Sequence, residues 1–153
     1  MINGKFICAA ALTCVTFAAT SDARTIGGYS GNPSQPNTVP LGCFFEAFGA
    51  VRGICNQING QNYGWIVPML TDTSGNKTVT LTGSAGSLTL TCTPFALNQT
   101  ETLFTAGNQV QWANTEPAAR VSTGANVPVR GYLYTFCTFQ GPGAQLDSVD
   151  WNV

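Results

Sequence analysis

Residues 77–95 read KTVTLTGSAGSLTLTCTPF, and the alternation of side chains within this stretch decides the fold. In its first half, Val79 and Leu81 face one way and the threonines between them face the other. After the turn-forming GSAG, the second half repeats the pattern, with an inward set of Leu88, Leu90 and Cys92. Alternation with a period of two is typical of antiparallel strands that have one buried and one wet face. The stretch therefore predicts two half-buried strands, with Cys92 pointing into the core.

Similar short runs recur along the chain, separated by turns rich in Gly, Asn and Pro. Further strands are expected at 39–48, 50–55, 63–70, 129–139 and 144–153, with two short ones inside 101–112. Pro68 lacks a ladder donor, so its strand should lie at an edge or carry a bulge. Residues 113–128 read mostly as loop.

About eight short strands with such turns predict an all-β protein, an antiparallel β-sandwich with a jelly-roll topology as one option. An immunoglobulin-like order is the main rival. That order places a tyrosine two residues before its second cysteine, whereas Thr135 stands two residues before Cys137. We therefore do not assign the immunoglobulin family.

The first 23 residues have the layout of a cleaved signal peptide. Lys5 precedes an uncharged apolar run, and Ser21 and Ala23 place small residues before a cut after Ala23. The run is too short to span a bilayer comfortably. We expect a secreted protein, periplasmic or extracellular, without membrane insertion after cleavage. An uncleaved anchor or a buried helix is the alternative.

The remaining chain divides by composition. Residues 24–38 are rich in Gly, Pro, Ser and Asn, which predicts a flexible N-terminal arm. Residues 39–153 then predict a single β-sandwich domain of ordinary size.

Cysteine arithmetic predicts two disulfides. Cleavage would leave four cysteines, an even number that allows three connectivities in an exported chain. We favour Cys43–Cys55 as a local clip and Cys92–Cys137 as a long-range bridge. A metal site is disfavoured because the chain has no histidine and no C-x-x-C pair.

Composition disfavours several function classes. Charged residues are 8% of the chain, against about 25% in average proteins. With a formal net charge of −1 and no basic patch, nucleic acid is not an expected partner. The lack of histidine removes the common triads, and no phosphate-binding loop occurs, so we expect neither a cofactor nor an enzyme. A carboxylate-based hydrolase remains the only catalytic alternative.

Two local motifs have ordinary explanations. Residues 72–76, DTSGN, alternate like the start of a calcium loop, but they lack the downstream Glu and are better explained as a hairpin turn. Asn76 and Asn98 match the N-glycosylation sequon, which matters only in a eukaryotic source. Neither motif is assigned a role.

The sequence leaves two main functions open. One is a non-catalytic binding or structural protein of the cell envelope or extracellular space, whose partners are other proteins. The other is a lectin-like module that binds neutral glycans through exposed aromatic rings. An exported protein inhibitor is a minor alternative. The candidate stacking residues are, in order of preference, Tyr132 and Tyr134, then Tyr63 and Trp65, then Trp112.

The strand at 129–139 poses a conflict about its two faces. A Cys92–Cys137 bridge would turn inward the set Leu133, Thr135, Cys137 and Phe139. The other face, with Tyr132, Tyr134 and Phe136, is the more apolar one. We follow the disulfide argument, which leaves these three aromatics either covered by another segment or exposed as a contact surface.

Overall fold

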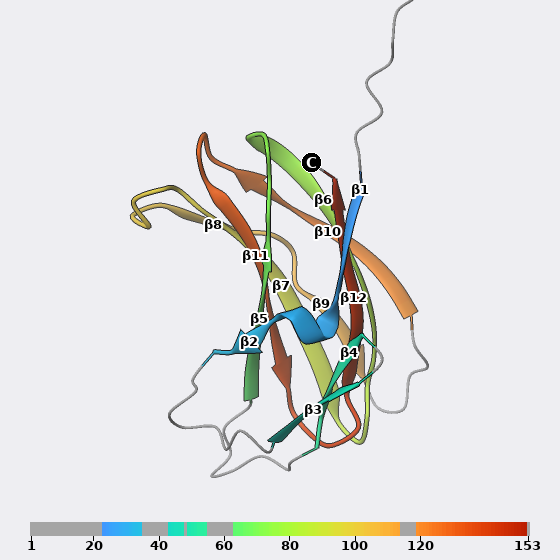
Figure 1. Ribbon diagram of the computed structural model, residues 1–153. Helices are drawn as coiled ribbons and strands as arrows, with labels where there is room; N and C mark the ends of the chain where they lie inside the picture. Colours follow the sequence, from blue (N-terminus) through green and yellow to red (C-terminus); the bar gives the residue numbers. More distant parts are fainter. Residues whose placement is uncertain (1–22, 35–42, 48, 55–62, 114–118, 153) are drawn as a thin grey trace, which may run out of the picture.

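The computed structural model describes residues 23–34, 43–47, 49–54, 63–113 and 119–152. These residues form two antiparallel sheets packed face to face, which confirms the predicted β-sandwich (Figure 1). No helix in this part of the chain is long and apolar enough to cross a membrane.

Sheet A has β12 (Gln145–Asn152) at its centre. One side of β12 pairs with β6 (Gly75–Ser84), which pairs in turn with β10 (Ala119–Val127). The other side pairs with two short strands placed end to end, β4 (Ala50–Gly53) and β1 (Ala23–Gly27). A hairpin from β4 adds β3 (Phe44–Ala47) at the edge.

Sheet B is built around β11 (Tyr132–Phe139). Its neighbours are β5 (Tyr63–Met69) and β7 (Thr89–Leu97). Beyond β7 lie β8 (Phe104–Ala106) and β9 (Val110–Ala113), and beyond β5 lies β2 (Asn32–Pro33), which the short helix η1 (Gly28–Ser30) connects to β1.

The core lies between the sheets and follows the predicted alternation. Val79 and Leu81 of β6 are fully buried, as are Leu90 and Cys92 of β7. In β12 a bulge between Leu146 and Ser148 shifts the register. Leu146 and Val149, three residues apart, therefore both point inward.

The three tryptophans are buried and hydrogen-bonded. The indole N–H of Trp65 donates to the carbonyl of Gly28 at 2.9 Å, and that of Trp151 donates to Leu70 at 2.8 Å. Trp112 donates to the carbonyl of Ala119 at 3.2 Å. Each buried ring thus avoids the cost of an unpaired donor and ties its strand to a neighbouring segment.

The predicted Cys92–Cys137 disulfide is present. The two cysteines lie directly opposite each other on β7 and β11, with Cα atoms 4.1 Å apart. The bridge therefore joins neighbouring strands of one sheet, at a position that faces the core. Cys43 is also disulfide-bonded, but its predicted partner Cys55 lies outside the described residues, so that pairing stays a prediction.

Three expectations need correction. Of the segment expected as a flexible arm, 24–38, the described part forms β1, η1 and β2, because β1 finds backbone partners at residues 148–152 of β12. Within the expected loop 113–128, β10 pairs with β6 over nine residues. Leu88 is 45% exposed, because β7 begins only at the next residue.

The placement of Pro68 agrees with expectation. On the outer side of β5, β2 pairs only with Ile66 and Trp65, so Pro68 lies along a free edge. A missing backbone donor has little cost there.

Candidate functional site

Charge is divided unequally between the two sheets. No strand of sheet B contains an Asp, Glu, Lys or Arg. The strands of sheet A carry Arg24, Glu46, Arg52, Lys77, Arg120, Asp147 and Asp150. The strands of one sheet are therefore all uncharged.

The faces of β11 point as the disulfide argument predicts. Leu133, Thr135, Cys137 and Phe139 are buried in the core. Tyr132 is 43% exposed, and Tyr134 and Phe136 are half-buried on the opposite, outward side. The more apolar face of this strand is thus the one that faces solvent.

The outward side of sheet B carries a cluster that we call the aromatic face: Phe95, Phe104, Tyr132, Tyr134 and Phe136. The rings of Phe95 and Tyr134 are stacked across neighbouring strands, with centroids 5.4 Å apart and planes 18° apart. Phe104 leans on Phe95 at 6.5 Å. Desolvation by these neighbours raises the pKa of the Tyr134 phenol above its usual 10.0.

Two rings of this face offer free surface. Phe104 is 64% exposed, and both Phe104 and Tyr132 lie opposite Leu97 in register, on either side of β7. At about 4.8 Å between strands, their backbones are separated by roughly 10 Å. The stacked Phe95 and Tyr134 occupy the adjacent row and support them from the side.

The loop between β7 and β8 holds Tyr132 in place. The Tyr132 hydroxyl donates to the carbonyl of Gln99 at 2.9 Å. The loop itself is organised by Asn98, whose side-chain oxygen accepts from the N–H groups of Thr102 and Leu103 and whose amide donates to Thr102 Oγ1. A fixed ring costs less entropy on binding than a free one.

Farther along the same side, the surface becomes hydroxyl-rich. Thr93 lies opposite Phe136, and Thr91 lies opposite Thr138, while Gln111 extends the latter row on β9. These side chains donate and accept hydrogen bonds without carrying charge. The neutral sheet thus offers an apolar half and a polar half.

Only part of the predicted set lies on this surface. Tyr132 and Tyr134 do, but Tyr63, Trp65 and Trp112 are buried, which excludes them as stacking surfaces. The sheets pack over Trp65 and Trp112, and Tyr63 forms a small cluster with Cys43 and Phe44.

Sequence reasoning missed Phe95 and Phe104. A signal existed for Phe95, because it shares the outward parity of the threonines in β7. Phe104 had none, because its three-residue strand has no pattern of its own.

The comparisons with known proteins identify the fold. No family model matches the chain, and neither does any curated protein. Among solved structures, it is similar to the C-terminal family 6 carbohydrate-binding module of the laminarinase LamC from Zobellia galactanivorans. That match has a TM-score of 0.55 at 13% identity and covers 86% of this chain and 100% of that one.

Two further structures agree. One is the CBM36-1 domain of a multidomain xylanase from the hindgut metagenome of Trinervitermes trinervoides, with a TM-score of 0.51, 11% identity and coverage of 86% and 98%. The other is the module CBM6cm-2 of Cellvibrio mixtus lichenase 5A in complex with cellotriose, with a TM-score of 0.52, 11% identity and coverage of 85% and 96%. The chain therefore shares the β-sandwich fold of these modules.

Proposed function

We propose that this protein is a non-catalytic carbohydrate-binding module that holds neutral glycans on the aromatic face. The observation that carries the proposal is a charge-free sheet whose outward side exposes aromatic rings. The shared fold supports it, and the lectin-like alternative of the sequence becomes the main function.

The chemistry of the face suits a neutral sugar. The C–H face of a pyranose ring is apolar and packs on Tyr or Phe, while its hydroxyl groups need neutral partners. The threonine rows beside the rings supply such partners. A charged polymer would meet no counter-charge on the strands of sheet B, which disfavours nucleic acid.

The geometry suggests how a chain of sugars lies. Phe104 and Tyr132 share one register row, so a ligand that contacts both would run across the strands. A separation of roughly 10 Å is too long for one sugar ring to contact both side chains, so the ligand would be an oligosaccharide. We infer an extended, neutral ligand of at least two sugar units.

The wider setting of the protein is also a proposal. A disulfide such as Cys92–Cys137 is typical of an oxidising compartment, which supports secretion. The predicted leader supports it too, but residues 1–22 lie outside the described residues. A secreted, non-catalytic module of this kind would bind a glycan and hold a partner protein close to it.

Affinity electrophoresis and calorimetry with neutral polysaccharides and their oligosaccharides test the function. We expect binding by the wild type, and at least a tenfold loss in Tyr132→Ala and in Phe104→Ala, because exposed aromatic anchors carry most of the energy in such sites. Leu88→Ala, an exposed apolar residue outside the aromatic face, is the matched control. Absence of binding across a broad neutral panel, or unchanged binding in both aromatic variants, would refute the proposal.

A second candidate function rests on the exposure of Leu103 beside Phe104. Contiguous exposed apolar side chains also mark protein contacts. If the aromatic face pairs with a second copy, sedimentation velocity will show a dimer that Phe104→Ala dissociates. A monomer at all concentrations leaves glycan binding as the function of this face.

A further inference from the structure

One end of the sandwich contains a groove beside the residues that lead into β11. This groove of about 370 Å³ lies between residues 71–74, which join β5 to β6, and residues 128–131, which join β10 to β11. This volume is at the lower end of the range for small-molecule sites. Three hydroxyl side chains, Thr71, Thr73 and Ser74, line one wall.

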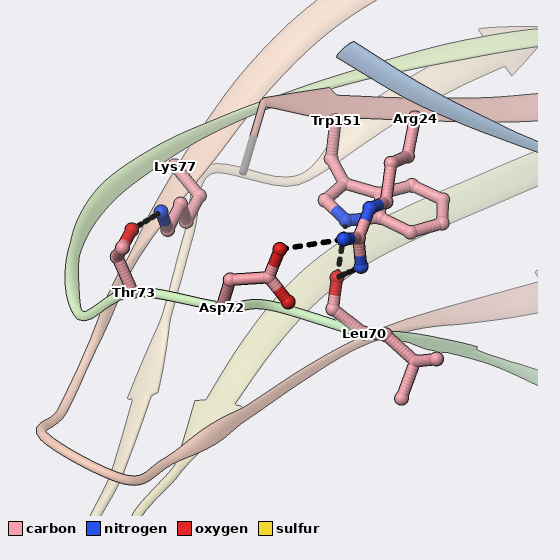
Figure 2. A network of polar contacts seen from close by, with 6 residues as sticks. All are labelled: Arg24, Leu70, Asp72, Thr73, Lys77 and Trp151. Carbon is pink, nitrogen blue, oxygen red and sulfur yellow. Dashed lines mark hydrogen bonds and ion pairs between the residues drawn. The ribbon is translucent and has the colours of Figure 1, made fainter. Parts of the chain in front are cut away.

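A buried cation lies directly behind this wall. Lys77 occupies an inward position on β6 and is only 4% exposed, and its Nζ donates to Thr73 Oγ1 at 2.6 Å (Figure 2). No carboxylate pairs with it, because the ion pairs of the described chain are Arg24–Asp72 and Arg120–Asp150. An ammonium group has three donors and is rarely buried without a counter-charge.

A second free cation stands on the opposite wall. Arg130 lines the groove with a φ of 58°, in a turn closed by the bond from Gly131 N–H to the carbonyl of Pro128 at 2.9 Å. A positive φ is unfavourable for Arg, and such strain often occurs at functional positions. Within the described residues, the guanidinium of Arg130 forms no hydrogen bond or ion pair.

The carboxylate that lines the groove is already paired with an arginine. Asp72 accepts from Arg24, whose guanidinium also reaches the carbonyl of Leu70 at 3.3 Å, the acceptor that Trp151 shares (Figure 2). Lys77 and Arg130 are thus two uncompensated positive charges in a chain that has only six Lys and Arg residues. The unpaired positive charges at the groove favour an anionic ligand.

We propose that this groove binds the carboxylate of an acidic sugar. Arg130 would pair with the carboxylate in the bidentate geometry typical of guanidinium groups. Lys77, which lies behind Thr73, would attract the carboxylate electrostatically without touching it. The hydroxyl groups of Thr71, Thr73 and Ser74 match those of a sugar ring. None of the residues of the aromatic face lines this groove, and the site does not depend on the proposed function.

Titration of the full chain with glucuronate and galacturonate, followed by amide NMR shifts, tests the site. We expect shifts confined to residues 71–77 and 128–131, weakening as salt is added because the contact is ionic. Glucose and galactose, the matched neutral sugars, should bind at least tenfold more weakly, and so should inorganic sulfate. Equal binding of sulfate or of the neutral sugars, or no shifts with either uronate, would overturn the proposal.

Two variants locate the effect. Arg130→Gly removes the guanidinium and relieves the positive φ, so it should fold at least as stably as the wild type and lose uronate binding by tenfold or more. Arg52→Gln removes a cation elsewhere on sheet A and should bind uronate normally. Uronate binding that persists in Arg130→Gly refutes the site. Tyr132→Ala should leave uronate binding intact, so failure of the aromatic face and failure of this groove are told apart.

Discussion

Removal of the Cys92–Cys137 bridge is expected to cost a large part of the stability. The cysteines are 45 residues apart, and closing a loop of this length lowers the entropy of the unfolded chain by an amount worth about 4 kcal/mol. A domain of this size has roughly 5–15 kcal/mol in total. The Cys92→Ala/Cys137→Ala variant should therefore stay folded at 25 °C but melt roughly 10–20 °C lower.

Urea denaturation monitored by tryptophan fluorescence gives the free energy of unfolding directly. The m-value should rise in the double variant, because an unfolded chain without the crosslink exposes more surface. The Cys92→Ser/Cys137→Ser variant is the control, since it also loses the bridge and, unlike chemical reduction, leaves the disulfide of Cys43 intact. A loss below about 1 kcal/mol in both samples would show that the bridge does not stabilise the fold by constraining the unfolded chain.

Three further results are expected. Leu81→Ala should lower the free energy of unfolding by about 2–5 kcal/mol in urea titrations because the side chain is fully buried, while Leu88→Ala at an exposed site should change it by less than about 0.5 kcal/mol. Asn98→Ala removes the side-chain bonds that organise residues 98–103, so hydrogen exchange there should accelerate while the rest of the sandwich keeps its protection; unchanged exchange would contradict this role. Because its folded pKa is raised, the Tyr134 phenol should ionise at higher pH than a free tyrosine. Its contribution to stability, fully present below pH 10, should be lost as the pH rises through the folded pKa. An ultraviolet titration should therefore show a component that ionises above pH 10 in the wild type and lack it in Tyr134→Phe.

The alternation of apolar and polar residues predicted the strands whose buried side it determines. Val79 and Leu81 lie inward because alternation alone determines the side of a half-buried strand. β10 was missed because Gly124 and Asn126 weaken its pattern, and its strand character comes from pairing with β6 more than 35 residues away.

The candidate site shows the same contrast between local patterns, which are predictable, and long-range packing, which is not. The predicted disulfide was enough to orient β11 and to place Tyr132 outside. It gave no means to separate Trp65, which is buried, from Tyr134, which is not, since both occupy aromatic-rich strands. Only the packing of the second sheet decides which side of such a strand is covered, and that packing joins segments far apart in the chain.

The position of β12 has a consequence for the order of folding. The last strand along the chain is the middle strand of sheet A, where it joins β6, β4 and β1. Sheet A therefore cannot close before β12 itself has been synthesised, and contacts as distant as Ala23 with Asn152 form only after that. Such non-local pairing makes folding slow.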